Sequence, residues 1–308
     1  MSYVYDTLII GGGPAGYTAA LYATRAGLNT AILERMSPGG QMALTDIIDN
    51  YPGFPEGVDG IMLGMNMQMQ AERFGAKTLY EDVVSVDFTD PSVKVVKTAN
   101  NTYHARTVII ATGANPRELG LDNERALTGK GVHYCAHCDG RFYKGKTVAV
   151  VGGGNSAVAD ALYLSRVTDK VYVIHRRDSL RATKIYHEPL MKAENVEFVW
   201  DSTVTEILSD GRVTGVRVKN LKDGSEQELA FSGLFVSIGR KPATDFLQGA
   251  LELDEYSYIV ADESTRTSVP GVFAVGDVRT KALRQVVTAV ADGATAIHYT
   301  EEFISGTH

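Results

Sequence analysis

The decapeptide at residues 7–16, Thr-Leu-Ile-Ile-Gly-Gly-Gly-Pro-Ala-Gly, decides the fold of this chain. Its apolar first part predicts a short buried strand, its glycines predict a tight turn, and the pattern from Tyr17 to Ala26 predicts a helix. A second apolar run, Thr30–Leu33, predicts the next strand and ends at the acid Glu34. Strand, glycine turn, helix, strand and acid in this order are the fingerprint of a dinucleotide-binding unit.

Each spaced glycine of this turn has a separate task. Gly11 allows the tight turn, Gly13 lets the backbone approach a pyrophosphate, and Gly16 lets the helix pack closely on the strand. The N-terminus of the helix then favours the negative charge of the phosphates. Glu34 follows at the distance where a carboxylate accepts hydrogen bonds from a ribose diol.

The same pattern returns in the second half of the chain, with the opposite charge at its end. The strand Val148–Val151 leads into a glycine turn at 152–157, and the strand Val171–Ile174 ends at His175-Arg176-Arg177, with Arg181 following. Guanidinium groups bind phosphate through paired hydrogen bonds, whereas a carboxylate repels it. The first site is therefore predicted to hold a cofactor with a free ribose diol, FAD or NAD, and the second to hold NADP(H).

Three further apolar runs, Thr107–Gly113, Leu234–Gly239 and Val272–Gly276, each predict a buried strand that ends in a turn. Asp277 follows the last of them, and two interpretations of it stay open. Its carboxylate accepts a hydrogen bond from a ligand hydroxyl, or it caps the helix that begins near Gln285. The methionines between the two repeats are predicted to form helix core or an adaptable packing surface; they are Met62, Met65, Met67 and Met69.

The two cysteines of the chain, Cys135 and Cys138, are separated by two residues. They are too few for a disulfide framework or a four-cysteine zinc site. Beside two dinucleotide units, this spacing predicts a reversible redox disulfide. Asp139 follows directly, and its carboxyl group is a candidate acid or base for the thiol proton. Turn or cap chemistry beside Gly140 is the alternative for this aspartate.

Two histidines near the cysteines raise the question of a metal. A site built from His133, Cys135, His137 and Cys138 would crowd four ligands into six residues, whereas structural zinc sites join two separated pairs. We therefore predict no metal. His137 then tunes the reactivity of the disulfide or faces solvent.

Composition disfavours several other classes of function. The chain has 308 residues, a hydrophobic fraction of 44% and a formal net charge of −7, typical of a globular protein of about two domains. A nucleic-acid function is disfavoured because no basic run is present. No apolar run reaches the roughly 20 residues of a membrane-spanning helix. Met1–Asp6 lacks the basic start of a signal peptide, so we expect a cytoplasmic protein without membrane association.

With these motifs the chain resembles the low-molecular-weight, bacterial-type thioredoxin reductases from Thr7 to about Ile297. The family's disulfide motif is usually C-A-T-C-D-G, and residues 135–140 are C-A-H-C-D-G. Its NADPH motifs, G-G-G-x-x-A and H-R-R-x-x-x-R, are intact at 152–157 and 175–181. Ferredoxin-dependent relatives typically lose these NADPH motifs. The long peroxide-defence flavoproteins carry an extra N-terminal region, and ferredoxin-NADP reductases lack the C-x-x-C pair.

The resemblance assigns residues to each cofactor and to catalysis. Its FAD contacts correspond to Gly11, Gly13, Ala15, Glu34, Gly40, Gln41, Asn50, Asp277, Arg284, Gln285 and Val286. Its NADPH contacts correspond to Gly152, Gly153, Gly154, Asn155, Ser156, Ala157, His175, Arg176, Arg177 and Arg181. Cofactor contacts are also expected from residues in or beside the glycine turns, namely Pro14, Gly16, Thr112, Gly113, Ile238, Gly239 and Gly276. The catalytic residues correspond to Cys135, Cys138 and Asp139.

The resemblance also implies an α/β architecture of two Rossmann-like, three-layer β/β/α domains. The FAD domain would be discontinuous, residues 1–116 and 244–308, with an NADPH domain, residues 117–243, inserted and carrying the disulfide. The family forms homodimers. A large rotation between its domains brings the disulfide and NADPH to the flavin in turn, with hinges expected near Ala114–Arg117 and Lys241–Thr244.

The implied reaction passes a hydride from NADPH to FAD, then reduces the Cys135–Cys138 disulfide, and then reduces the disulfide of thioredoxin. In the family, the cysteine matching Cys138 lies nearer the flavin, the one matching Cys135 attacks thioredoxin, and Asp139 is the acid or base. Docking of the carrier and interdomain packing are both open roles for the residues after the disulfide, Arg141, Phe142 and Tyr143.

Other functions on the same fold stay open. One is a dithiol oxidase or reductase that acts on a small-molecule disulfide, and another is a ferredoxin-dependent relative. A third is a flavin-binding regulatory protein with an inactive disulfide. Oxygen consumption with a small dithiol would identify the oxidase, and absence of turnover with FAD bound would identify the regulatory protein.

Overall fold

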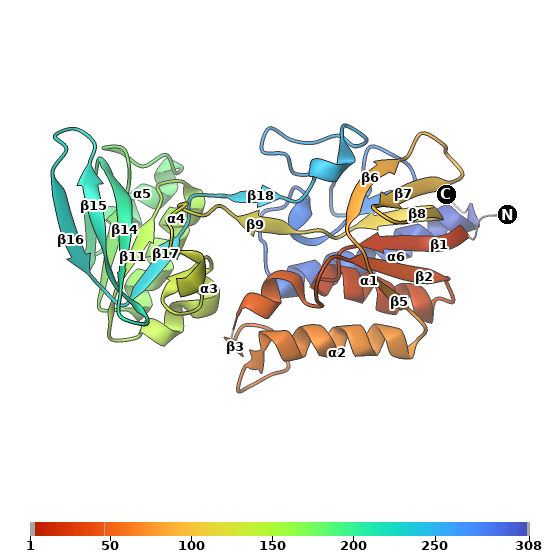
Figure 1. Cartoon of the computed structure of the whole chain (residues 1–308), viewed down its shortest axis with the longest axis horizontal. Coiled ribbons are helices and arrows are strands. Elements are labelled where there is room, and N and C mark those ends of the chain that lie inside the picture. Colours follow the sequence, from red (N-terminus) through yellow and green to blue (C-terminus); the bar gives the residue numbers. More distant parts are fainter. Residues whose placement is uncertain (1–3, 46, 307–308) are drawn as a thin grey trace. The chain divides into compact units, whose positions relative to one another are not determined.

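The computed structural model describes residues 4–45 and 47–306, which divide into two compact units. One unit comprises Met1–Asn115 and Lys241–His308, and the other comprises Pro116–Arg240 (Figure 1). The chain leaves the first unit through β9 (Ala114–Pro116) and returns through β18 (Arg240–Pro242), and these two strands pair with each other. Each unit contains one of the two glycine turns.

The first unit is built on a sheet with the strand order β5-β2-β1-β8-β7-β6, in which β19 also pairs with β8. Its strands are β1 (Val4–Ile10), β2 (Thr30–Glu34), β5 (Lys77–Tyr80), β6 (Val83–Asp87), β7 (Lys94–Thr98), β8 (Thr102–Ile110) and β19 (Val272–Ala274). The strands β2, β8 and β19 run parallel to β1 or to each other, while β6 and β7 are antiparallel. The strands predicted around the first glycine turn and before Gly113 and Gly276 are confirmed.

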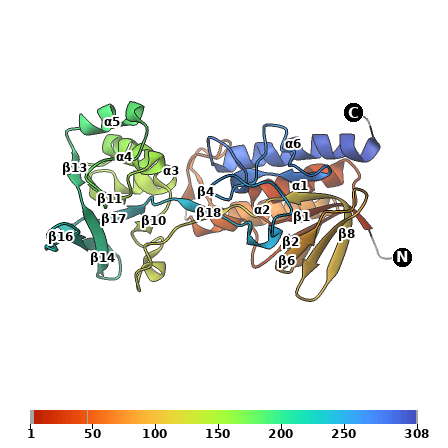
Figure 2. The same ribbon diagram turned by 90° about the horizontal axis from the view of Figure 1, so that it is seen from above.

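Both faces of this sheet are covered, because alternate residues of its strands point to opposite sides. The helices α1 (Pro14–Arg25), α2 (Gly60–Arg73) and α6 (Val286–Ser305) lie on the side where Ile9, Ile32 and Ile109 pack against helix alanines. The strands β6 and β7, with the first part of β8 that pairs with β7, and the segment around Leu247–Ile259 cover the other side, against Leu8 and Ile110. Figure 2 shows these three layers, and the predicted β/β/α arrangement is confirmed.

The second unit repeats the three layers. Its central sheet has the order β10-β17-β11-β12-β13, and a second sheet has the order β14-β15-β16. The strands are β10 (Val132–His133), β11 (Thr147–Val151), β12 (Lys170–Ile174), β13 (Val196–Val199), β14 (Ser202–Ser209), β15 (Val213–Asn220), β16 (Glu226–Ala230) and β17 (Gly233–Val236). Helix α4 (Asn155–Val167), with α3 (Ala136–Asp139) and α5 (Lys184–Met191), packs on one face, and the three-stranded sheet packs on the other.

Two glycines set how closely the helices of the first unit approach its turn. A Cβ on Gly16 would lie 1.9 Å from the carbonyl oxygen of Gly11, and a Cβ on Gly293 would lie 2.3 Å from that of Ala15. Any larger side chain would push α1 off the turn or α6 off α1. The close packing predicted at Gly16 is confirmed.

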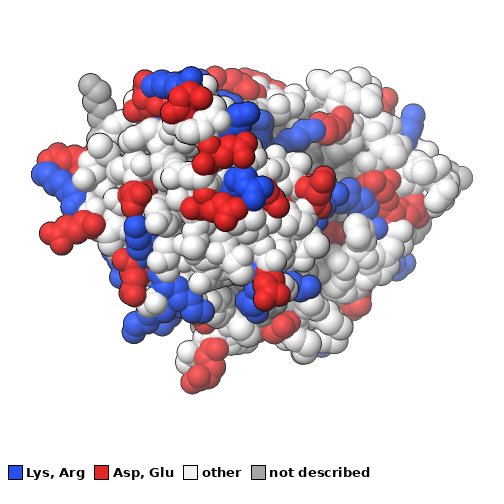
Figure 3. Space-filling model, turned by 60° about the vertical axis from the view of Figure 1, so that its left-hand side comes forward, with Lys and Arg blue, Asp and Glu red and all other residues white. Residues whose placement is uncertain are grey.

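The surface differs from expectation at α2. Three of its methionines, Met62, Met65 and Met69, are exposed, whereas Met67 is partly buried. Of the two predicted roles, helix core is wrong for these three, and an adaptable packing surface stays a prediction. The short strands β3 (Ile47–Ile48) and β4 (Val58–Asp59) precede this helix. Lys and Arg are interspersed with Asp and Glu over the face drawn in Figure 3. Among the described residues, no helix combines the length and apolar composition needed to cross a bilayer.

Candidate active site

The first glycine turn leaves an open space at the start of α1. Gly11 has φ +107°, and a Cβ there would lie 2.5 Å from the carbonyl oxygen of Ala111, so only glycine fits. Gly13 differs, because no described atom beyond its own chain neighbours lies within 4 Å of the position of its Cβ. Helix α1 starts at Pro14 without a side-chain cap or an acid in its first turn. An uncapped helix start beside open space suits a phosphate group.

Segments that are distant in the sequence meet at this turn. Glu34 accepts a hydrogen bond from the amide of Gly12 at 2.7 Å, which fixes its carboxylate at the edge of the turn. A Cβ on Gly40 would lie 3.5 Å from Cα of Gly13. On the other side, a Cβ on Gly276, which has φ +72°, would lie 3.1 Å from the Cβ of Ala15. Three of the segments predicted to contact FAD are therefore brought together.

The remaining residues predicted for FAD occupy two pairs and a strand end. The carbonyl oxygen of Asp277 accepts a hydrogen bond from Nε of Arg284 at 3.4 Å, and Asn50 Nδ2 donates to Gln285 Oε1 at 2.9 Å. Gln41 donates to Asn115 at 3.1 Å. At the end of β8, the hydroxyl of Thr112 donates to the carbonyl oxygen of Ala243, and Gly113 accepts from the amide of the same residue. Val286 is the first residue of α6.

Asp277 does not cap helix α6. The helix starts after Gln285, whose side chain forms a reciprocal capping box with Thr288, so the capping interpretation of Asp277 is wrong. Asp277 instead lies in a 3₁₀ turn, Gly276–Val278, that follows β19. Its interpretation as a ligand contact stays a prediction.

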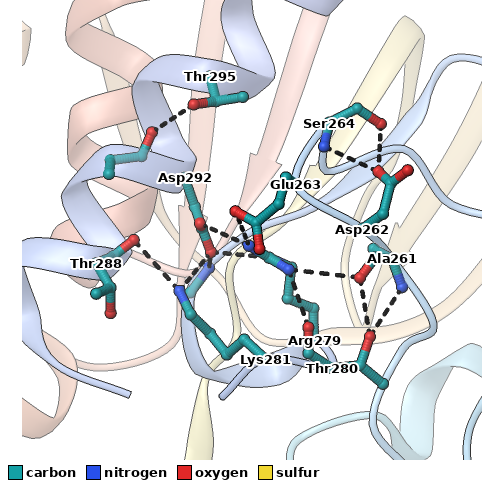
Figure 4. Close-up of polar contacts among 12 residues, drawn as sticks. Ala261, Asp262, Glu263, Ser264, Arg279, Thr280, Lys281, Thr288, Asp292 and Thr295 are labelled. Carbon is teal, nitrogen blue, oxygen red and sulfur yellow. Dashed lines mark hydrogen bonds and ion pairs between the residues drawn. The ribbon is translucent and has the colours of Figure 1, made fainter. Parts of the chain in front are cut away.

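A buried charged cluster that the sequence did not reveal holds this turn (Figure 4). Asp292 of α6 accepts hydrogen bonds from the amide of Gly276 at 2.8 Å, from Nε and Nη2 of Arg279 at 2.9 Å, and from Nζ of Lys281 at 2.8 Å. The exposed fractions of the arginine, lysine and aspartate side chains are 2%, 6% and 9%. One carboxylate thus fixes the turn that carries Asp277 to the helix behind it.

The carboxylate of Asp292 stays ionised at neutral pH. Burial alone would raise the pKa of Asp292, but the hydrogen bonds from Arg279 and Lys281 outweigh burial and hold the pKa below its ordinary value. Two buried cations, Arg279 and Lys281, face the one carboxylate of Asp292. The exposed carboxylate of Glu263 also lies 3.9 Å from the guanidinium of Arg279. The sequence contained one feature from which this cluster could have been predicted. Asp292 is an acid within the apolar stretch of α6, and such an acid is unusual unless it has a buried partner.

The second glycine turn repeats the geometry of the first. A Cβ on Gly152, which has φ +146°, would lie 2.4 Å from the carbonyl oxygen of Ser237. No described atom lies within 4 Å of the position of a Cβ on Gly154, and α4 also starts without a side-chain cap. Asn155 Oδ1 accepts from the amide of Thr183 at 2.8 Å. Ser156 is exposed and Ala157 is buried, while Ile238 and Gly239 follow the end of β17.

The basic cluster of the second turn separates into a buried histidine and three exposed arginines. His175 is buried under Gly153, whose Cβ would lie 2.4 Å from its ring, and its Nε2 has no described hydrogen-bond partner. Burial and the charges of Arg181, Arg177 and Arg176 lower the pKa of His175, so its imidazole is neutral at neutral pH. The amide of Arg181 donates to the carbonyl oxygen of Gly153 at 2.7 Å. The turn is therefore rimmed by cations where the first turn has a carboxylate.

The two cysteines form a disulfide at the start of α3. Cys135 is the N-cap residue, and its sulfur accepts a hydrogen bond from the amide of Cys138 at 3.2 Å. A Cβ on Gly140 would lie 2.8 Å from Leu164, so the disulfide helix packs directly on α4. Because α4 also begins at the second glycine turn, one helix supports both features.

Asp139 is held by a histidine and does not cap a turn. Its Oδ2 lies 3.0 Å from Nδ1 of His133, and the following turn receives no side-chain cap from it, so the capping interpretation is wrong. His137, the other nearby histidine, is 49% exposed, and its ring stacks on Tyr163 at 4.5 Å between centroids. Within residues 4–45 and 47–306, no group of three or more His, Cys, Asp or Glu side chains is placed to hold a metal.

Comparisons with known proteins agree with this arrangement. A family model described as pyridine nucleotide-disulphide oxidoreductase matches residues 5–293. The thioredoxin reductase of Listeria innocua is 47% identical over 302 residues, covering 98% of this chain and 94% of its own. Among solved structures, a thioredoxin reductase from Streptococcus pyogenes has a TM-score of 0.92 and 45% identity, covering 99% of this chain and 100% of its own. One from Giardia duodenalis has a TM-score of 0.91 and 40% identity at the same coverage.

The Asp292 cluster predicts a specific dependence of stability on pH. Asp292→Asn should lower the free energy of unfolding by about 3–5 kcal/mol at pH 7, because it leaves two buried cations without a counter-ion. A carboxyl group whose pKa is lowered by folding adds stability above the unfolded pKa of about 4, and loses it as the pH falls through the folded value. The difference between variant and wild type should therefore shrink below about pH 4.

Urea unfolding between pH 7 and pH 3 measures this difference. The control is Asp82→Asn, at an exposed aspartate of the same unit, which should change stability little at any pH. A loss at pH 7 that stays constant down to pH 3, or no loss at pH 7, would contradict the role assigned to Asp292.

Proposed function

The chain belongs to the pyridine nucleotide-disulphide oxidoreductase family, and we propose that it is a thioredoxin reductase, an NADPH-dependent flavoprotein that reduces the disulfide of thioredoxin. The observation that carries this proposal is a C-x-x-C disulfide seated on the helix that starts at a cation-rimmed glycine turn. The names of the relatives support thioredoxin as the substrate.

The two turns fit two different cofactors. In the first unit, the uncapped start of α1 suits the pyrophosphate of FAD, and Glu34 suits its ribose diol. Asp277, in the 3₁₀ turn after β19, suits a ligand hydroxyl. In the second unit, the exposed groups of Arg176, Arg177 and Arg181 suit the 2′-phosphate of NADPH. We therefore assign residues 1–116 and 244–308 to FAD, and residues 117–243 to NADPH.

The chain's own sulfurs complete the reaction. When bound, the two cofactors supply a two-electron path from NADPH to the Cys135–Cys138 disulfide. The reduced Cys135 sulfur attacks the carrier disulfide and forms a mixed disulfide, and Cys138 then attacks that bond to release the carrier dithiol. The amide of Cys138, which reaches the sulfur of Cys135, would stabilise a thiolate there and so supports Cys135 as the attacking residue. Asp139 takes up and returns the thiol proton.

Location and assembly follow from the same chemistry and surface. A dithiol that must cycle is suited to a reducing compartment, so we place the protein in the cytoplasm.

We also propose a homodimer that buries the exposed face of α2, where Ile61, Met62, Met65 and Met69 are 43% to 56% exposed. Methionine side chains are adaptable, and clustered exposed apolar side chains mark interaction surfaces.

The substrate assignment predicts a separation of two half-reactions. Under anaerobic conditions, NADPH should bleach the flavin of both wild type and Cys135→Ser, because this substitution leaves both glycine turns intact. Oxidised thioredoxin should restore the colour of wild type and fail to restore that of the variant. Carrier reduction by Cys135→Ser at the wild-type rate would refute Cys135 as the attacking thiol. Wild-type bleaching that thioredoxin does not reverse would refute thioredoxin as the substrate and favour a small-molecule disulfide.

The arginine rim predicts the choice of nicotinamide cofactor. Replacing Arg176 and Arg177 by alanine should raise KM for NADPH by roughly 10- to 150-fold, the equivalent of about one charge-assisted hydrogen bond, and leave KM for NADH unchanged. Steady-state kinetics with both nucleotides measure this, with Arg166→Ala, an exposed arginine later in α4, as the control. An equal rise in KM for both nucleotides would contradict recognition of the 2′-phosphate.

The assembly proposal predicts a mass of two 33.3 kDa chains in sedimentation velocity. Met65→Asp should shift the protein to the monomer, because it would bury a charge in an apolar interface. Tyr256→Asp, at an exposed apolar residue outside α2, should leave the dimer intact. A wild-type monomer, or a Met65→Asp dimer of unchanged affinity, would contradict the proposed interface.

A further inference from the structure

Three polar side chains behind the disulfide, those of Asp139, His133 and Tyr143, form a hydrogen-bonded triad. The reaction proposed above uses only Asp139. Oδ2 of Asp139 lies 3.0 Å from Nδ1 of His133, and Nε2 of His133 lies 2.6 Å from the hydroxyl of Tyr143. The three residues come from α3, from β10 and from the 3₁₀ turn that follows α3. The exposed fractions of Asp139 and His133 are 13% and 9%, and Tyr143 is buried. Tyr143 is therefore unsuited to docking a carrier.

The hydrogen bonds among these three side chains agree with a single arrangement of protons. Burial raises the pKa of Tyr143 to about 12, so its hydroxyl stays protonated at neutral pH. The positive charge of Arg212 acts on that hydroxyl oxygen and favours its lone pairs, which leaves the O–H to donate to Nε2 of His133. A neutral imidazole that accepts at Nε2 carries its proton on Nδ1, and Nδ1 then donates to Asp139. Each contact thus has one donor and one acceptor.

Among the hydrogen-bond and ring partners of His133 in the described part of the chain, Asp139 is the charged one. From β17, the ring of Phe235 stacks on the imidazole at 5.3 Å between centroids. Lys146 lies over the ring of Tyr143, with Nζ 5.7 Å from the ring centroid. Arg212 also lies near that tyrosine. His137 belongs to a separate group, since it faces Asp160 and Tyr163 on α4. Removing the imidazole of His133 therefore acts first on the carboxylate of Asp139.

We propose that His133 is a positioning residue for thiol–disulfide exchange, which holds the carboxylate of Asp139 beside the cysteines in a tautomer fixed by Tyr143. The proposal rests on the proposed function, because it needs Asp139 to exchange the thiol proton. In that exchange, a cysteine S–H loses its proton to Asp139 as its sulfur bonds to a sulfur of the carrier. The carrier S–S bond breaks to leave a mixed disulfide, and Asp139 returns the proton to the departing carrier thiolate. The second cysteine S–H then loses its proton to Asp139 as its sulfur bonds to the first cysteine sulfur; the mixed disulfide breaks, and the proton passes to the second carrier thiolate. Over both steps the dithiol is oxidised by two electrons and the carrier disulfide is reduced by two.

The test compares side chains that keep or lose the donor to Asp139. His133→Phe removes both ring nitrogens and keeps a ring against Phe235, whereas His133→Asn keeps an N–H donor at the place of Nδ1. Tyr143→Phe removes only the hydroxyl that fixes the tautomer. The rate at which each pre-reduced protein reduces thioredoxin is measured by rapid mixing between pH 5.5 and 9. Flavin reduction by NADPH and the melting temperature are measured on the same samples.

We expect His133→Phe to slow carrier reduction about 10- to 100-fold, a part of the 10²–10⁴-fold that general acid–base catalysis supplies, and to shift the inflection of the pH profile. His133→Asn should recover most of the rate, and Tyr143→Phe should fall between Phe and wild type. Flavin reduction by NADPH should be unchanged throughout. His137→Gln, which removes the other imidazole near the disulfide, should retain the wild-type inflection.

Distinct outcomes would overturn the proposal. A His133→Phe protein with the wild-type rate and pH profile would show that His133 does not position Asp139. Equal slowing by Phe and Asn with an unchanged inflection would indicate packing alone. A shift of the inflection caused by His137→Gln would show that the inflection depends on His137 and not on the contact between His133 and Asp139. Asp139→Asn is the remaining arm. If it reduces thioredoxin at the wild-type rate, the role of Asp139 in the proposed function fails, and the role of His133 fails with it.

Discussion

Both units depend on a contact between backbone segments that no side chain could share. At Gly16 and at Gly152, a Cβ would lie 1.9 Å and 2.4 Å from a carbonyl oxygen, so strand, turn and helix meet only because these residues are glycine. This approach aims the uncapped start of α1 or α4 at the space beside the turn. In the first unit, α6 packs on α1 through a further glycine, Gly293, and in the second unit the helix that carries the disulfide packs on α4. The sites are consequences of backbone geometry before any side chain acts.

The two units show how one scaffold serves opposite electrostatic demands. Glu34 is fixed at the first turn by the amide of Gly12, while Arg176 and Arg177 stand exposed at the second. Buried groups support each rim. The neutral ring of His175 fills the space under Gly153, and Asp292 holds the turn that carries Asp277. We expect the carboxylate rim and the guanidinium rim to select different riboses, while the pyrophosphate site stays the same.

Local patterns made the strands, the glycine turns and the redox pair predictable, because each depends on residues close together in sequence. The features that the sequence did not predict depend on the direction in which side chains point in the folded protein. Asp292 is an acid in an apolar helix, and only the fold shows that Arg279 and Lys281 point at it from a distant turn. The sequence places His133 two residues before Cys135, and only the fold shows that its ring contacts Asp139. Met65 follows the helical period of α2 but lies on its outer side.

The pairing of β19 with β8 has a consequence for the order of synthesis. Residues 272–274 complete the sheet of the first unit, and α6 covers it, yet both emerge from the ribosome after the whole of the second unit. The second unit, made from one continuous segment, has all its strands available first. Until β19 and α6 are made, the nascent first unit keeps an unpaired edge of β8 and an uncovered apolar face. Such features recruit chaperones or lead to misassociation. A translational pause after residue 240 would lengthen that exposure, and rapid synthesis of the last 68 residues would shorten it.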